Sequence, residues 1–477
     1  MFAAINSILG SIDNFVWGIP LIVAILFTGL FLTARLKGVQ FSNLARAFRL
    51  MKEDKEEGAD GEVSSFGALC TALSATIGTG NIVGVATAIV AGGPGAMFWM
   101  WFAALFGMAT KYSECLLAIN YREVSADGHI LGGPFYTIEK GMGKNWKWLA
   151  MCFAFFGTLV GLFGIGTFTQ VNGIASAVNN FFDPQNAWTV TLFGQPYSWT
   201  VVIAGAFVAV FAALVIIGGL ERISKVAQII VPFMVVLYVL MGLILICCNI
   251  TKIPGAFKEI VMDAFGLRAV AGGMLGAMIV AMQKGIARGI FSNEAGLGSA
   301  PIAASAAQVS QPVQQALVSM TGTFLDTIVV CSITGLAIVI SGSWNTGLQG
   351  VAVTSDAFSK GLPFLGQIVP FLLMVCLIFF AFTTILGWDY YSERCIEYMS
   401  KNMTVVKTYR WLYIICIFIG PYMTVSAVWT IADIVNGLMA VPNIISLLVL
   451  SGVIVKLTRD YFSKLPKGCD KLPKEDK

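Results

Sequence analysis

Two polar, glycine-rich interruptions lie inside otherwise apolar segments, and their residue types are the best suited in the sequence to bind a solute. The first is SATIGTGN at residues 74–81, where two glycines flank a threonine and an asparagine follows. In a membrane, backbone without helical hydrogen bonds is tolerated only where it lines a cavity or is buried in protein. Unwinding here would free carbonyl groups for a cation and amide groups for an anion. Close helix packing through small residues is the alternative, and this motif alone does not decide between the two.

The second interruption is QKGIARGIFSNEAGLGSAP at residues 283–301, which places four glycines, an Asn-Glu pair and a proline inside one long apolar segment. The two interruptions open two successive groups of apolar segments. Paired interruptions at corresponding positions of two halves are the best sequence indication of a transporter binding site. The correspondence is one of hydropathy and interruption, since the halves share no evident sequence identity.

Charged residues inside the apolar segments are few. Lys284 and Arg288 are four residues apart and lie on one helical face. The carboxylates with which they could pair are Glu294, Asp326 and Asp389. Lys111 and Glu114 are three residues apart and could pair with each other. Because buried charge in a membrane needs a partner, we expect structural pairing for each of these residues rather than substrate contact.

Two adjacent hydroxyl groups, those of Thr383 and Thr384, fall in the middle of the apolar segment FFAFTTILGW. Threonines in such positions usually donate to a carbonyl group of their own helix. If they lie near freed carbonyl groups of residues 74–81, they would instead complete an oxygen shell for a small, hard cation.

The composition shows that the elements positioning these residues are membrane-spanning helices. Of the 477 residues, 57% are hydrophobic and 12% are charged, and the mean hydropathy is +0.81. A soluble domain carries about 25% charged residues, whereas a helix that crosses a bilayer needs about 20 consecutive apolar residues. Eleven spans are predicted, at residues 15–36, 66–91, 96–120, 148–178, 199–220, 223–248, 270–309, 316–341, 366–391, 405–427 and 430–456. The second and seventh contain the interruptions and are expected to be broken.

Most of the 30 Lys and Arg residues lie in alternate loops, and this asymmetry predicts the orientation. The opposite loops contain only Lys252, Lys258, Arg268 and Lys360. We therefore expect the N-terminus outside and the C-terminus in the cytoplasm of a plasma-membrane protein. The chain is predicted to be one transmembrane domain, with an extra helix at 15–36, inverted repeats at 66–248 and 270–456, and a cytoplasmic tail at 457–477.

Several function classes are disfavoured by the sequence. The net charge of +4 is too small to indicate nucleic-acid binding, and the sequence lacks the GxxxxGK[ST] phosphate-binding motif. His129 is the only histidine, so a membrane-embedded enzyme would lack a convergent acid, base or metal set. A passive channel would show rings of repeated filter residues rather than two unlike broken helices.

Three stretches resemble the alanine or glycine:cation symporter family, also called sodium:alanine symporters, of the amino acid-polyamine-organocation superfamily. They are SATIGTGNIVGVATA (74–88), GGPGAMFWMWFAALFGMATKYSE (92–114) and FSNEAGLGSAPIAA (291–304). The resemblance extends over essentially the whole chain. It implies an all-α polytopic protein with a leucine-transporter-like 5+5 inverted repeat, one added N-terminal helix and about 11 transmembrane helices.

The resemblance also implies how the first interruption binds its ligands. It implies a sodium site built from the carbonyl groups of Ser74 and Ile77 and the hydroxyl groups of Thr383 and Thr384. The amides of Thr79 and Gly80 would receive the carboxylate of the substrate. Thr76 and Asn81 match a second cation site, which the substrate carboxylate often completes, so whether a cation occupies it stays open.

Three further contacts are expected around the same site. Carbonyl groups near Phe291, Ser292 and Asn293 are the natural partners of a substrate ammonium group. Gln170 would contact the substrate, or else form a hydrogen bond between helices. Trp388 would line the side-chain pocket or close the cytoplasmic path, unless it is a simple packing aromatic.

Together these features predict secondary active, sodium-coupled import of a small neutral amino acid, alanine or glycine, by alternating access. Na⁺ would be the coupling ion, with no organic cofactor and no nucleotide. The alternatives are the same fold carrying glutamine or another neutral amino acid, or using protons. In the proton-coupled case, Glu294 is the candidate carboxylate.

Overall fold

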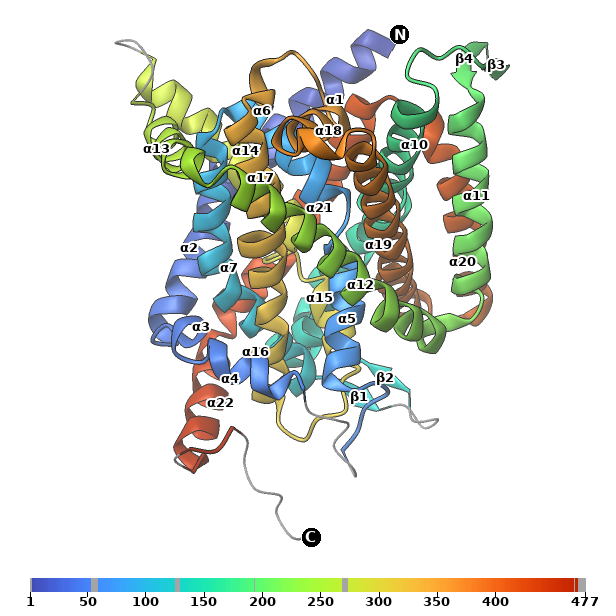
Figure 1. The fold of residues 1–477 in the computed structure, drawn as a ribbon. Coiled ribbons are helices and arrows are strands. Elements are labelled where there is room, and N and C mark those ends of the chain that lie inside the picture. Colours follow the sequence, from blue (N-terminus) through green and yellow to red (C-terminus); the bar gives the residue numbers. More distant parts are fainter. Residues whose placement is uncertain are drawn as a thin grey trace.

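The computed structural model describes residues 2–52, 59–124, 129–192, 194–267, 273–466 and 468–470 of the chain. These residues form a bundle of long helices with only two short β-hairpins (Figure 1). Within the described residues, ten helices are long and apolar enough to cross a membrane, or up to eleven if a bent helix pair is one span. The protein is therefore an all-α polytopic membrane protein, as predicted.

The bundle is built from 22 α-helices, of which the first twelve cover residues up to Cys248. They are α1 (Phe2–Val16), α2 (Ile19–Arg35), α3 (Val39–Ser42), α4 (Leu44–Leu50), α5 (Ser65–Thr76), α6 (Val85–Gly92), α7 (Gly95–Asn120), α8 (Pro134–Tyr136), α9 (Lys147–Phe163), α10 (Phe168–Phe182), α11 (Trp199–Ile216) and α12 (Gly219–Cys248). The hairpins join β1 (Glu123–Val124) to β2 (Ile130–Leu131) and β3 (Thr189–Leu192) to β4 (Gln195–Ser198).

The remaining ten helices complete the bundle. They are α13 (Ile253–Ala264), α14 (Met274–Asn293), α15 (Ala300–Ala304), α16 (Pro312–Thr323), α17 (Ser332–Ser341), α18 (Val351–Gly361), α19 (Ile368–Ser400), α20 (Met403–Ile419), α21 (Val425–Val449) and α22 (Ser451–Lys464). Two π-helical segments connect parts of spans: η1 (Gly80–Gly84) precedes α6, and η5 (Phe324–Cys331) joins α16 to α17. Such segments are rare and frequently mark functional sites.

Both predicted breaks are present. The second predicted span is divided into α5 and the η1–α6 segment, which meet at an angle of 51°. The seventh is divided into α14 and α15 by residues 294–299, where Glu294, Gly296 and Gly298 have φ values of +57°, +95° and +79°. Glycine adopts such values without strain, and Pro301 is tolerated because it lies in the first turn of α15.

Three other spans contain interruptions that were not predicted. The first span begins earlier and consists of α1 and α2, because Gly18 and Pro20 interrupt the helix. The fourth, predicted to be continuous, is broken between α9 and α10 at residues 164–167, where a Cβ atom on Gly166 would lie 2.5 Å from the carbonyl oxygen of Gly161. The last is divided into α21 and α22 on either side of Leu450.

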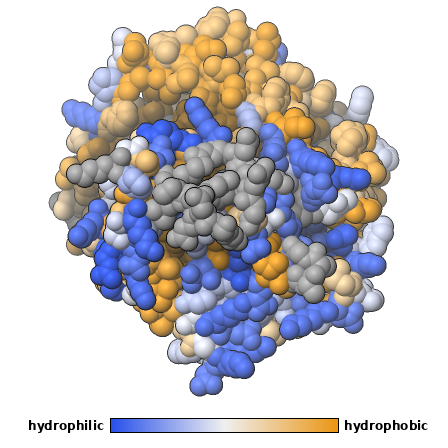
Figure 2. Space-filling model, turned by 90° about the horizontal axis from the view of Figure 1, so that it is seen from below, coloured by the Kyte–Doolittle hydropathy of each residue, from blue (hydrophilic) through white to orange (hydrophobic). Residues whose placement is uncertain are grey.

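Helices α1 and α22 lie at opposite ends of the bundle, and these ends define two faces (Figure 1). We call them the N-terminal face, which carries α18 and β3–β4, and the C-terminal face, which carries α22 and β1–β2. Hydrophilic residues gather over the middle and lower part of the C-terminal face, and hydrophobic residues gather along its upper edge in this view (Figure 2). On the flank, the exposed side chains of α11 and α12 include Phe207, Phe211, Ile229 and Phe233. This pattern is that of a bundle whose sides face hydrocarbon and whose ends face water.

Candidate functional site

The break between α5 and η1 exposes backbone groups to two other helices. The amide of Thr79 donates to the Oε1 atom of Gln170 on α10, at 3.0 Å. The hydroxyl group of Thr384 on α19 lies 3.1 Å from the carbonyl oxygen of Ile77 and 3.0 Å from that of Phe380 in its own helix, and it can donate to either. The break therefore presents an amide toward α10 and a carbonyl group toward α19. An anion and a cation could each bind by replacing one of these contacts.

The four predicted sodium ligands come from α5 and its end (Ser74 and Ile77) and from α19 (Thr383 and Thr384). In the described hydrogen bonds, only two of them contact each other. Helices α5 and α19 touch, since a Cβ atom on Gly387 would lie 2.7 Å from the Cβ atom of Ala75. Ile77 and Thr384 are in contact, as described above. The hydroxyl of Thr383 donates to the carbonyl oxygens of Phe379 and Phe380 in its own helix. The hydroxyl of Ser74 likewise donates to Thr71, and the role predicted for Ser74 involves its carbonyl group instead.

The two residues predicted for a second cation site point in different directions. The Thr76 hydroxyl donates to the carbonyl oxygen of Ala72, at 2.7 Å, within α5. Asn81 accepts a hydrogen bond from the Gly78 amide at 2.9 Å through Oδ1. Its Nδ2 atom donates to the Oδ1 atom of Asp326 at 2.6 Å. Asn81 thus connects the first break to η5, whereas Thr76 does not.

Asp326 joins the two breaks, and the predicted site residues did not include it. This fully buried carboxylate accepts hydrogen bonds from Asn81 at the first break and from Ser292 at the end of α14, the latter at 2.9 Å. The hydroxyl of Thr327 also donates to it, at 2.7 Å. In the sequence, Asp326 is a lone acidic residue in an apolar span, and we interpreted it only as a partner for Lys284 or Arg288.

The second break lies directly against the first. A Cβ atom on Gly80 would lie 3.2 Å from the Cα atom of Ser292, so only glycine allows this approach without displacement. Asn293 donates to the hydroxyl oxygen of Thr327 at 3.0 Å and accepts from the amide of Ala295 at 2.9 Å. Phe291 packs on Trp429 of α21, with ring centroids 4.8 Å apart. The structure therefore brings Gly80 against the end of α14, where Phe291, Ser292 and Asn293 lie.

Trp388 lies beside the second break, one turn beyond Thr384 toward the C-terminal face. Its Nε1 atom donates to the Oε1 atom of Glu294 at 2.8 Å, while Ser299 donates to the other carboxylate oxygen of Glu294 at 2.7 Å. All three residues are buried. Trp388 therefore ties α19 to the non-helical segment 294–299.

A second carboxylate, Glu114 of α7, holds the middle of that segment. Its Oε1 atom accepts hydrogen bonds from the amide of Gly296 at 2.9 Å and from Asn443 of α21 at 2.6 Å. Asn443 also donates to the carbonyl oxygen of Gly296, at 3.0 Å. Side chains thus satisfy both backbone groups of Gly296, as buried peptide groups require. Sequence reasoning missed Asn443, because nothing in its local sequence indicates this long-range contact.

The predicted ion pairs inside the membrane were wrong. Arg288 pairs with Asp433 of α21 through two contacts of 2.6 and 2.7 Å, because it lies on the face of α14 that packs against α21. The guanidinium group also lies 4.6 Å from the ring centroid of Trp429. Among the described contacts, the buried Nζ atom of Lys111 has no hydrogen-bond partner, so it does not form the expected pair with Glu114.

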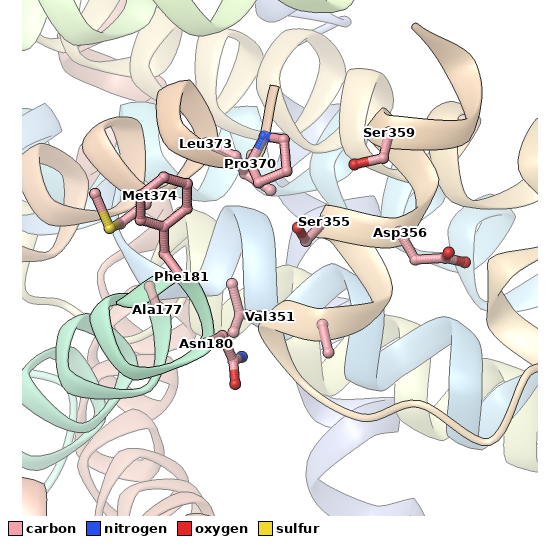
Figure 3. Close-up of a pocket in the computed structure, with 11 residues that line it drawn as sticks. Ala177, Asn180, Phe181, Val351, Ser355, Asp356, Ser359, Pro370, Leu373 and Met374 are labelled. Carbon is pink, nitrogen blue, oxygen red and sulfur yellow. The ribbon is translucent and has the colours of Figure 1, made fainter. Parts of the chain in front are cut away.

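A cavity of about 310 Å³ lies on the N-terminal side of the breaks, between α10, α18 and α19 (Figure 3). Its polar lining comes from Asn180, Ser355, Asp356 and Ser359, and its apolar lining includes Phe181 and Met374. The cavity lies over the same two helices, α10 and α19, that contribute Gln170 and Thr384 to the first break.

Comparisons with known proteins show the family of the chain. The profile of the sodium:alanine symporter family matches residues 2–476. The "Sodium/alanine symporter AgcS" of Methanococcus maripaludis is 47% identical, with 95% of this chain and 97% of that protein covered. The "Probable sodium/glutamine symporter GlnT" of Bacillus subtilis is 37% identical, over 98% of this chain and 92% of that protein.

A solved structure shows the same fold. The crystal structure of MhsT in complex with L-phenylalanine superimposes with a TM-score of 0.55 at 16% identity, covering 84% of this chain and 99% of that one. At this identity the likeness concerns the fold alone, whereas the family profile covers nearly every residue of the chain. The chain therefore belongs to the sodium:alanine symporter family and is a multi-pass membrane transporter.

Proposed function

We propose that the protein is a sodium-coupled symporter that imports a small neutral amino acid, alanine or glycine, by alternating access. The observation that carries this proposal is the first break, where the Thr79 amide faces Gln170 and the Ile77 carbonyl faces Thr384. A zwitterion has a carboxylate for freed amides and an ammonium group for freed carbonyls, and a small cation can share the remaining oxygen atoms. A single site can then bind both solutes.

The sodium ion would bind between α5 and α19. The contact between Ile77 and Thr384 supplies a carbonyl and a hydroxyl oxygen within 3.1 Å of each other. We assign the carbonyl of Ser74 and the hydroxyl of Thr383 as the remaining protein ligands, with the Thr383 hydroxyl rotating away from its own helix. Sodium would thereby fix the position of α5 against α19 and favour one conformation of the transporter.

The amino acid would bind between the two breaks. Its carboxylate would displace the Gln170 side chain from the Thr79 amide and also reach the Gly80 amide, while its ammonium group would reach carbonyls near Phe291, Ser292 and Asn293. The Gly78 backbone is already in close contact with both neighbouring helices, because a Cβ atom there would lie 2.5 Å from Thr384 Oγ1 and 2.9 Å from Gln170 Oε1. The preference for alanine or glycine over glutamine is supported by the higher identity to the sodium/alanine symporter AgcS, 47%, than to the probable sodium/glutamine symporter GlnT, 37%.

Two side-chain contacts are suited to close the paths to this site. The ion pair between Arg288 and Asp433 spans α14 and α21 toward the N-terminal face, which we place outside the cell in accordance with the Lys and Arg distribution. The hydrogen bond between Trp388 and Glu294 spans α19 and the second break toward the cytoplasm. Rocking of the two proposed repeats, 66–248 and 270–456, would open one contact while the other stays closed.

Competition for a radiolabelled substrate tests the choice of amino acid. In proteoliposomes with an inward sodium gradient, excess unlabelled alanine or glycine should inhibit [³H]alanine uptake, and excess glutamine should inhibit it much less. Glutamine that competes as well as alanine would contradict the small-substrate proposal and favour the glutamine alternative. Uptake of none of the neutral amino acids would contradict the proposed function as a whole.

Proton coupling is the second candidate, because Glu294 is a buried carboxylate at the second break. We expect Glu294→Gln to lower the maximal uptake rate by about tenfold, since one hydrogen bond to a charged group contributes about 1.5–3 kcal/mol. The remaining uptake should still follow the sodium gradient. The measurement is uptake driven by a sodium gradient or by a pH gradient, with Glu221→Gln, a change at an exposed glutamate, as the control. Uptake driven by the pH gradient in the wild type and lost in Glu294→Gln would instead support proton coupling.

A further inference from the structure

Helix α1, which precedes α2 in the first span, lies outside the proposed repeats, yet it packs beside the ion pair between Arg288 and Asp433. The Nε1 atom of Trp17, which directly follows α1, donates to the carbonyl oxygen of Asp433 at 2.8 Å. Four residues later on α21, a Cβ atom on Gly437 would lie 2.4 Å from Cγ1 of Val16. The end of α1 therefore fixes the part of α21 that supplies the acidic partner of Arg288.

A cavity of about 50 Å³ separates α1 from this ion pair. Charged residues from three helices line it: Asp13 from α1, Lys284 and Arg288 from α14, and Asp433 from α21. Two acidic and two basic side chains thus face one small space. A cavity of this size holds about one or two water molecules. The side chains of Arg288 and Asp433 are only 14% and 9% exposed, so solvent screens their interaction weakly, whereas Lys284 is exposed.

In the described contacts, Asp13 and Lys284 lack the direct partners that Arg288 and Asp433 find in each other. The Oδ1 atom of Asp13 is buried and has no hydrogen-bond partner among the described residues; Asp433 repels the carboxylate, whereas Arg288 and Lys284 attract it. Buried polar atoms are usually hydrogen-bonded, so this oxygen atom is available to accept a donor. Arg288 is suited to be that donor, because in this conformation both of its terminal nitrogens are bound to Asp433.

We propose that Asp13 makes α1 part of the gate, by accepting Arg288 when the pair between Arg288 and Asp433 separates. This inference rests on the proposed transport cycle. When α14 and α21 move apart, Arg288 would otherwise be left as a buried, unpaired charge, which strongly opposes opening. Transfer of the guanidinium group across the small cavity to Asp13 keeps the charge compensated throughout. Asp13 is then a positioning residue that sets the rate of opening and does not touch the substrate.

The expected kinetic result separates this role from a structural one. Asp13→Asn should lower the maximal rate of sodium-driven uptake about fivefold and leave KM for alanine within about twofold, because the change acts on a conformational step and not on substrate binding. Asp13→Glu should restore most of the rate, since it returns a carboxylate to the cavity. The melting temperatures of both variants should remain close to that of the wild type. Asp460→Asn, which removes a half-exposed carboxylate on α22, is the matched control.

A second readout does not depend on transport. Hydrogen–deuterium exchange of the purified protein, with sodium or with potassium, reports opening between α14 and α21. In peptides covering 283–293, deuterium uptake in sodium is compared with deuterium uptake in potassium. We expect Asp13→Asn to change the difference between these two values. An unchanged uptake rate and an unchanged exchange pattern in Asp13→Asn would overturn the inference. A slower rate that Asp13→Glu does not restore, accompanied by a lower melting temperature, would also overturn it. Absence of uptake in the wild type would contradict the proposed function, and the exchange measurement would still decide the role of α1.

Discussion

Thr384→Ala should raise the sodium concentration needed for half-maximal uptake about tenfold, because a ligand to a charged group contributes about 1.5–3 kcal/mol and 1.4 kcal/mol corresponds to a factor of ten. Thr384 is the residue of α19 whose hydroxyl reaches the first break, at 3.1 Å from the Ile77 carbonyl oxygen. Its removal should weaken sodium binding more than selectivity among amino acids, since no substrate atom is assigned to it. The measurement is the initial rate of alanine uptake as a function of sodium concentration.

Thr384→Ser is the matched control for this prediction. Serine keeps the hydroxyl group and loses only the methyl group, so the sodium dependence should stay close to that of the wild type. If Thr384→Ala has unchanged sodium dependence, the ion is not bound between α5 and α19. If alanine and serine variants are equally impaired, packing of the methyl group rather than cation binding explains the loss.

Asp326→Asn should reduce uptake at least as strongly, because this side chain connects the two breaks. Its carboxylate accepts from Asn81 in η1, from Ser292 at the end of α14 and from Thr327 beside it. Asparagine offers a single acceptor oxygen and turns an NH₂ group toward these donors, so at least one buried hydrogen bond is lost. We expect the apparent affinities for sodium and for alanine to fall together, each about tenfold. Initial rates measured over a matrix of the two concentrations give both values.

The control for Asp326→Asn replaces a carboxylate by an amide at a position that contacts neither break. Glu221→Gln meets this condition, because the side chain is 81% exposed and pairs with Lys225 one turn away on α12. It should transport at the wild-type rate. A change in the alanine affinity of Asp326→Asn without a change in its sodium affinity would contradict the view that Asp326 couples the two breaks.

The spans and the two most polar breaks of this protein were predictable because they depend on local sequence. An apolar run of sufficient length must cross the bilayer as a helix, since no water is present to satisfy its backbone. Glycines at 78 and 80, and the run around Gly296 and Gly298, weaken the helix where they occur. The contact between these two segments, with Gly80 against Ser292, does not follow from local sequence; their corresponding positions in two halves suggested a shared site.

The contacts between helices were much less predictable. Arg288 could have met any of several carboxylates, and the choice of Asp433 depends on which face of α14 packs against α21. Asp326 gave no sign of its three donors, because Asn81 and Ser292 are distant from it in sequence. The break before α10 was also missed, since glycines at 164 and 166 looked like ordinary small residues of a membrane helix. These outcomes depend on the tertiary arrangement of helices, which one sequence does not specify by local rules.

A protein with few charged residues can bind charged solutes because its backbone amide and carbonyl groups can take the place of charged side chains. The first break offers the amide of Thr79 and the carbonyl group of Ile77, and uncharged side chains bind both of them in the present conformation. The carboxylates nearby, Glu114, Glu294 and Asp326, hold the non-helical segments in place. Charge near the site thus serves mainly to position the segments that would bind the solutes.

Accumulation of alanine against its own gradient tests the central claim most directly. Proteoliposomes that contain the purified protein are loaded with potassium and diluted into a solution of [³H]alanine and sodium. The membrane potential is held at the same value in this experiment and in its controls. Alanine inside should rise transiently above its external concentration, and the rise should disappear when sodium is equal on both sides or is replaced by potassium. Accumulation of the same size without a sodium gradient would contradict sodium-coupled symport at the two broken helices.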